Sequence, residues 1–214
     1  MPQIPPAVVN ALNNDLPRFA VAASRPAPET PPSLVVRPSI ARSGRTLSQS
    51  LQTSLAQGAA TGAGAPVTVL GLDELAAGKP LRQVKPRLWA QILPAAEGGQ
   101  QAMAEVDQGA GKVTSVVEGP QVRALTKRIA GLASPTARAT SARQTLALIR
   151  VPALHLTAVW LQGAAGEADD VVIPNDGPIA PLVPGQRYSL AEFQGIVKAM
   201  ATERLAKTGD AMGG

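Results

Sequence analysis

The stretch Thr145–Gly163, TLALIRVPALHLTAVWLQG, is the most apolar segment of the chain and decides the centre of the fold. Its apolar residues form two runs of strand length that meet at Pro152, and a proline cannot donate a hydrogen bond to a strand ladder. We therefore expect two strands with a bend or bulge between them. Alternate residues of a strand share a face, so the face of the second strand that we expect to lie in the core carries Leu154, Leu156, Ala158 and Trp160.

His155 is the only histidine of the chain and is expected on the opposite face of that second strand. A catalytic histidine needs a nucleophile, an orienting carboxylate or a metal beside it. The nearest carboxylates that follow it, Asp169 and Asp170, lie in GEADD, which we interpret as a hairpin loop with solvated charges. We interpret His155 as a structural or surface residue. The alternative is a small-molecule-binding or hydrolytic α+β domain that uses His155 and a carboxylate.

Apolar runs of strand length also flank this stretch on both sides. The clearest are the two runs of residues 101–119, which are joined by the glycine-rich QGAG and predict a hairpin. One helix is expected over residues 120–132, and a second over 190–207, where Ser189 and Glu192 form a capping box. The sequence predicts an α+β fold with an antiparallel sheet of about five strands covered by two helices, preceded by a long extended N-terminal arm.

Residues 1–66 differ in composition from the rest and are rich in Pro, Ala and Ser. We interpret them as an arm or linker, because they carry too little apolar surface to fold alone, and residues 67–214 as an α+β globular domain. We also expect residues 1–60 to be dispensable for folding. The candidate partner or anion contacts in this arm are its arginines: Arg18, Arg25, Arg37, Arg42 and Arg45.

The residue inventory excludes several chemistries. The chain has no cysteine, which excludes disulfides, thiol catalysis and Cys-ligated metal. Neither a G-x-S-x-G turn nor the spacing of a phosphate-binding loop occurs. Two further carboxylate pairs occur, Asp73/Glu74 and Glu105/Asp107. The second pair could frame an acid/base site, but we interpret it as part of a solvated strand face. We therefore predict no catalytic, metal-ligating or cofactor-binding residue and no cofactor.

The formal net charge is +5 and the sequence pI is near 10.1. No dense Lys/Arg run occurs, and five aromatic residues leave few for base stacking. Nucleic-acid association through the arm arginines is an alternative rather than the favoured hypothesis. No segment reaches the roughly 20 apolar residues of a membrane span, and the N-terminus lacks a signal-peptide pattern. We expect a cytoplasmic or assembly-associated protein.

The leading functional hypothesis is a non-enzymatic structural or protein-interaction component of a bacterial multi-protein assembly. The bias towards Ala, Pro, Gly and Arg is typical of GC-rich bacterial genomes. We expect the protein to contact a partner protein or a second copy of itself through its N-terminal arm.

Overall fold

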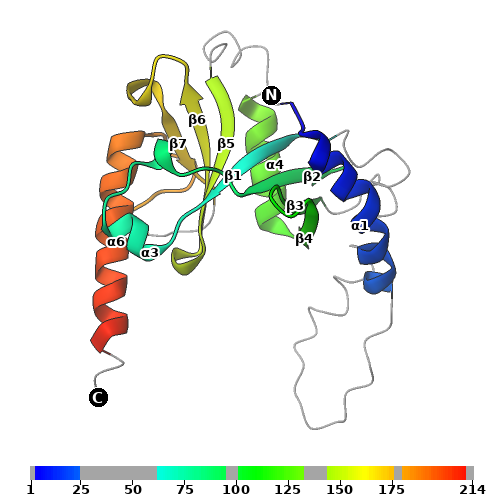
Figure 1. Ribbon diagram of the computed structural model, residues 1–214. Helices are drawn as coiled ribbons and strands as arrows, with labels where there is room; N and C mark the ends of the chain where they lie inside the picture. Colours follow the sequence, from blue (N-terminus) through cyan, green and yellow to red (C-terminus); the bar gives the residue numbers. More distant parts are fainter. Residues whose placement is uncertain (1–2, 25–61, 95–100, 133–143, 176–179, 211–214) are drawn as a thin grey trace. The chain divides into compact units, whose positions relative to one another are not determined.

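The computed structural model describes residues 3–24, 62–94, 101–132, 144–175 and 180–210. It is an α+β fold whose eight strands form one mixed sheet in the order β4-β3-β2-β1-β5-β6-β7-β8 (Figure 1). The strands are β1 (Gly64–Val69), β2 (Leu88–Leu93), β3 (Ala102–Asp107), β4 (Lys112–Glu118), β5 (Gln144–Val151), β6 (Leu156–Gly163), β7 (Val171–Pro174) and β8 (Tyr188–Ser189). The α-helices of the described residues are α1 (Pro6–Ser24), α3 (Leu72–Ala76), α4 (Pro120–Leu132) and α6 (Leu190–Asp210).

The expectation of about five antiparallel strands covered by two helices is wrong in number and in topology. Strands β1 and β5 pair in parallel, with Val67 opposite Leu148. Parallel neighbours need a long crossover connection instead of a tight turn, so no local turn signal marks this pair in the sequence. Three further elements raise the counts of strands and helices above those expected: the two-residue strand β8, the short helix α3 and helix α1.

The chain divides into two compact units, which we describe separately. Unit 1 contains Ala65–Leu88 and the described residues from 127 onwards. Unit 2 contains the described residues before 65 and residues 89–126. That an independently folding domain begins at residue 67 stays a prediction.

The core of unit 1 is built on the β5–β6 pair and helix α6. Leu156, Ala158 and Trp160 of β6 are almost completely buried in one cluster with Phe193 and Val197 of α6. This confirms for Leu156, Ala158 and Trp160 that this face of the second strand lies in the core, where it packs against α6. Leu154 instead lies in a single 3-10 turn, Pro152–Leu154, and is only partly buried. On the opposite face of β6, Val159 and Leu161 are buried as well.

Helix α6 begins at the capping box that the sequence indicates. The backbone N–H and the hydroxyl of Ser189 donate to Glu192 Oε2 over 2.8 and 2.7 Å. In return, the backbone N–H of Glu192 donates to Ser189 Oγ over 3.3 Å. These bonds satisfy donors that a bare helix terminus would leave without partners, and they fix where the apolar stripe of α6 starts.

Helix α1 forms inside the segment that was expected to be an extended arm. Pro6 suits the first helical turn because its missing N–H would have no helical acceptor there. Val8, Leu12 and Leu16 recur every four residues and are fully buried. They pack in one cluster whose strand members are Trp89, Leu93, Ala102, Ala104, Val106 and Val113. The extended-arm prediction is therefore wrong for residues 6–24, while residues 25–61 lie outside the described part of the chain.

A side chain of α1 also completes the hydrogen bonding of strand β4. Asp15 Oδ2 accepts a hydrogen bond from the backbone N–H of Val113 over 3.0 Å. Strand β4 is the last in the sheet order, and an edge strand presents backbone groups that need partners. Asp15 thus ties α1 to the sheet of unit 2 by a polar contact in addition to the apolar one.

Candidate functional site

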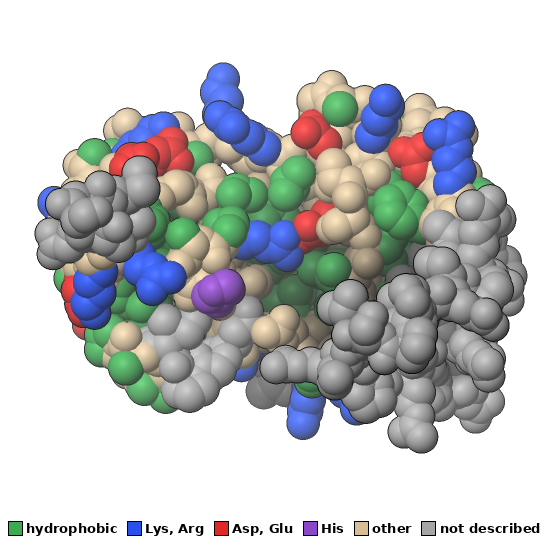
Figure 2. Space-filling model, turned by 90° about the horizontal axis from the view of Figure 1, so that it is seen from below, with side chains coloured by type: hydrophobic (Ala, Val, Ile, Leu, Met, Phe, Trp, Pro, Cys, Tyr) green, Lys and Arg blue, Asp and Glu red, His purple; other side chains and the backbone are tan. Residues whose placement is uncertain are grey.

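His155 lies in a turn and not in the strand where it was expected. Strand β6 begins one residue later, and His155 itself ends the Pro152–Leu154 turn in the left-handed conformation, with φ 50°. Its backbone N–H donates to Pro152 O over 3.0 Å. The residue is exposed, and the purple side chain is visible at the surface in Figure 2.

The carboxylates weighed as partners of His155 are at the other end of the strand. His155 precedes the first residue of β6, whereas Asp170 binds the backbone of Gly163, the last residue. Seven residues of extended chain span about 23 Å. His155 and Asp170 therefore cannot act on one substrate atom. Within the described ranges, no group of three His, Cys, Asp or Glu side chains is placed to hold a metal ion.

Asp170 is instead the centre of a buried hydrogen-bond network. Its side chain is fully buried and accepts bonds from Arg82 Nε (3.0 Å) and from an Arg82 terminal nitrogen (2.5 Å). The Trp160 indole donates to Oδ2 over 3.0 Å and the Gly163 N–H to Oδ1 over 2.7 Å. Arg82 also donates to Gly163 O over 2.8 Å. The network joins the 3-10 turn Leu81–Gln83 to the β6–β7 connection.

Sequence reasoning missed both members of this ion pair. Asp170 was interpreted as solvated together with Asp169, and Arg82 was not singled out. The two residues are 88 positions apart, so no local spacing rule connects them. One local feature distinguishes the two aspartates in the sequence. Asp170 directly precedes the apolar run that forms β7, whereas Asp169 is one residue further from it.

Four hydrogen bonds set the ionisation of Asp170. Burial alone would raise the pKa of this carboxyl group. The bonds from Arg82, Gly163 and Trp160 outweigh burial, and they hold the pKa of Asp170 below its ordinary value. The same contact raises the pKa of Arg82. Both groups are charged across the physiological range. The Arg82–Asp170 ion pair therefore has a structural role and does not donate or accept protons near neutral pH.

Asp170→Asn is expected to lower the free energy of unfolding at neutral pH by about 2–3 kcal/mol, since hydrogen bonds to charged groups contribute roughly 1.5–3 kcal/mol. A carboxyl group whose folded-state pKa is lowered stabilises the fold fully above its unfolded pKa, about 3.9. That stability disappears as the pH falls through the folded value. Urea unfolding at about pH 7, 5 and 3 should therefore show the parent and the variant converging only at the lowest pH. Asp169→Asn, which neutralises the exposed neighbour, is the control; equal effects of the two variants at pH 7 would contradict the assignment.

The other carboxylate pairs have structural roles. Glu74 Oε2 accepts from the Gly71 N–H over 3.3 Å, and Glu74 Oε1 pairs with Lys79 over 2.8 Å. Glu105 is buried and accepts from the Ser115 hydroxyl over 2.7 Å. Asp107 Oδ1 accepts from the backbone N–H groups of the hairpin turn, Gly109 and Ala110. The predicted hairpin is confirmed, but the interpretation of Glu105 as solvated is wrong.

One of the five arm arginines lies in the described residues. Arg18 is on α1, its side chain is 83% exposed, and a terminal nitrogen is 3.8 Å from Asp15 Oδ1. An exposed ion pair of that length contributes little to stability, so the Arg18 guanidinium is available to a partner. The others lie outside the described part of the chain: Arg25, Arg37, Arg42 and Arg45.

The described residues on both sides of the segment that carries those arginines belong to unit 2. Helix α1 precedes it and is anchored by buried Leu12 and Leu16. Where the description resumes, Gly62 O accepts from Gln91 Nε2 over 2.7 Å, and Ala63 O accepts from the Ile92 N–H over 2.8 Å. A Cβ at Gly64 would lie 2.5 Å from the Trp89 indole nitrogen, so only glycine permits this close approach of the chain to β2.

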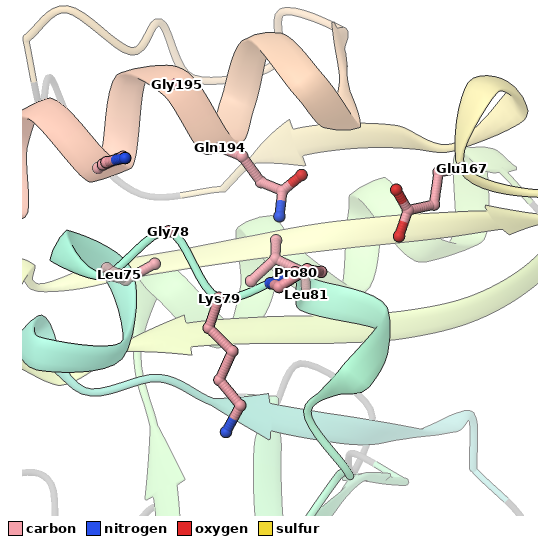
Figure 3. Close-up of a pocket in the computed structure, with 9 residues that line it drawn as sticks. Leu75, Gly78, Lys79, Pro80, Leu81, Glu167, Gln194 and Gly195 are labelled. Carbon is pink, nitrogen blue, oxygen red and sulfur yellow. The ribbon is translucent and has the colours of Figure 1, made fainter.

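A pocket of about 250 Å³ lies within unit 1 (Figure 3). Its residues come from α3 and the turn after it, from the 3-10 turn Glu167–Asp169 and from α6. His155 does not line it. The lining residues are Leu75, Gly78, Lys79, Pro80, Leu81, Glu167, Gln194, Gly195 and Lys198.

Comparison of the chain with protein-family models, with curated proteins and with solved structures finds no match. Among the helices of the described residues, none combines the length and the apolar character that crossing a membrane requires.

Proposed function

We propose that the protein is a non-enzymatic structural or protein-interaction component of a bacterial multi-protein assembly, and that it contacts its partner through residues 25–61. The supporting observation is that the described residues on both sides of this segment pack in unit 2. Helix α1 packs there through Leu12 and Leu16, and Gly62 and Ala63 accept hydrogen bonds from strand β2.

The composition of the segment also suits partner contact. It carries four arginines and one acidic residue, Glu29, and arginine is enriched at protein interfaces. We propose an acidic protein surface as the partner, with a second copy of the chain as the other candidate.

Replacing Arg25, Arg37, Arg42 and Arg45 together by glutamine tests this proposal. We expect the variant to fold like the parent, because none of the four lies in a described core, and to lose most of the partner protein that co-purifies from native expression. A matched variant removes four exposed cations elsewhere: Lys85, Lys112, Arg123 and Arg187. It lowers the net charge equally and should keep the partner. Equal losses in both variants would show that overall charge, and not this segment, holds the partner.

The nucleic-acid alternative predicts a different result in the same experiment. Co-purifying material that disappears on nuclease treatment would be nucleic acid. Binding of the protein to double- or single-stranded nucleic acid that persists at about 200 mM salt would overturn the proposal, because counterion release weakens nonspecific binding steeply as salt rises. We expect weak binding that is lost at that salt concentration.

A further inference from the structure

The pocket of unit 1 has charges of opposite sign at its two ends and apolar residues between them. We propose that it binds a small zwitterion whose carboxylate and ammonium groups are separated by a methylene chain, the class of the ω-amino acids. This site is separate from residues 25–61 and does not depend on the interaction role proposed for them.

The cationic end of the pocket is Lys198 on helix α6. Its Nζ lies 3.1 Å from the position that a Cβ on Gly78 would occupy. Gly78 has φ 70°, a conformation that favours glycine, and its missing side chain leaves room beside the ammonium group. No described carboxylate forms an ion pair with Lys198. The second lysine of the lining, Lys79, is paired with Glu74, and in Figure 3 its side chain points away from Gln194.

The anionic end is Glu167, which precedes the buried Asp170 by three residues. Figure 3 shows Glu167 and Gly78 on opposite sides of the pocket, with Gln194 reaching down from α6 between them. Arg82 binds Asp170 through Nε and one terminal nitrogen. Glu167 is exposed and forms no ion pair with a described residue; its charge acts on Arg82 only at longer range, where it adds to the effect of Asp170 and raises the pKa of that guanidinium. A ligand ammonium group can approach Glu167 from its exposed side.

The centre of the pocket suits a short aliphatic chain. Pro80 is an exposed lining residue and supplies apolar surface there, whereas Leu75 and Leu81 are only 4% and 0% exposed. The amide of Gln194 can both donate and accept a hydrogen bond. On the α6 side the pocket is kept open at Gly195, where a Cβ would meet no heavy atom within 4 Å.

The test is a titration of the full chain with 6-aminohexanoate, followed by NMR chemical shifts. We expect shifts of the Gln194 side-chain amide and of backbone amides around Gly78 and Glu167, with a Kd of about 1 mM, as befits a few weak contacts. Hexanoate and hexylamine each lack one charge and should bind at least about fivefold more weakly, the effect of one partly exposed ion pair. Equal shifts with either compound would overturn the zwitterion assignment.

Variants locate the site. Lys198→Gln and Glu167→Gln should each weaken 6-aminohexanoate about fivefold, and Lys85→Gln should not. Gly195→Leu should fill the pocket and abolish the shifts, whereas Gly131→Leu on α4, where a Cβ also meets nothing within 4 Å, should leave them unchanged. Both leucine variants should keep the dispersed spectrum of a folded protein. Retained binding in Gly195→Leu, or no shift in the parent at about 10 mM ligand, would refute the proposal.

Discussion

Replacing Trp160 by alanine is expected to lower the free energy of unfolding by about 3–5 kcal/mol, the usual cost of removing a buried large aromatic residue. Trp160 is 1% exposed and lies in the same cluster as Phe193 and Val197. Its indole also donates to Asp170, so the variant loses a hydrogen bond to a buried charge in addition to packing. A typical domain has 5–15 kcal/mol of stability in total, and we expect little soluble Trp160→Ala protein.

Two control variants separate the contribution of core packing from that of the hydrogen bond to Asp170 and from the effect of an exposed substitution. Trp160→Phe keeps most of the volume but removes the hydrogen bond to Asp170, and should cost about 1–3 kcal/mol. His155→Ala changes an exposed turn residue and should cost at most about 1 kcal/mol. Urea unfolding of Trp160→Ala can be followed by far-UV circular dichroism, because the remaining tryptophan, Trp89, lies in unit 2. If Trp160→Ala unfolds like the parent while His155→Ala abolishes a measurable activity, the core assignment is wrong and the enzyme alternative gains support.

Leu12→Ala should destabilise unit 2 by about 2–5 kcal/mol, because a fully buried leucine leaves a cavity that its neighbours fill only in part. Leu12 is 0% exposed and packs in the cluster that contains Trp89. The structure thus reverses the expectation that residues 1–60 are dispensable. A chain that begins at residue 62 should melt well below the parent in circular dichroism, and Trp89 should emit at longer wavelength as it meets water.

Asn13→Ala is the matched control for Leu12→Ala. It lies one residue further along the same helix, on the exposed side, and alanine has the higher helix propensity. The thermal unfolding midpoint of Asn13→Ala should equal or slightly exceed that of the parent. A truncated chain that melts like the full one would show that α1 contributes nothing to the fold, and would restore the arm interpretation.

Local sequence signals predicted the elements whose causes are local. The alternation of β6 predicted that Leu156, Ala158 and Trp160 share a buried face, and they do. The capping box predicted the start of α6 at Ser189, and the glycine-rich turn predicted the β3–β4 hairpin. In each case the determining residues lie within a few positions of one another, where spacing carries information.

The features that sequence reasoning missed depend on residues far apart in the chain. The parallel β1–β5 pair places Val67 opposite Leu148, and the ion pair joins Arg82 to Asp170, 88 positions further along the chain. Helix α1 was missed for a different reason. Pro17 lies inside it, and the surrounding prolines and small residues masked the four-residue spacing of its buried side chains.

The candidate site was predictable to a smaller extent. His155 drew attention because it is unique, but it ends a turn about 23 Å of strand away from the carboxylate considered with it. The pocket lining combines residues from three separate segments, and its open end depends on glycines. Glycines inside apolar or charged stretches give no sequence signal for a cavity.

Site-specific photo-crosslinking in native cells tests the central claim most directly. A photoreactive amino acid is placed at Val36, inside the proposed contact segment, and in separate chains at Asn14 on α1 and at Val183, which is 52% exposed. We predict one protein adduct of defined mass from position 36 and none at comparable yield from positions 14 and 183. An adduct from position 14 or 183 with none from position 36, or nucleic acid as the adduct, would contradict the proposal that residues 25–61 contact a partner protein.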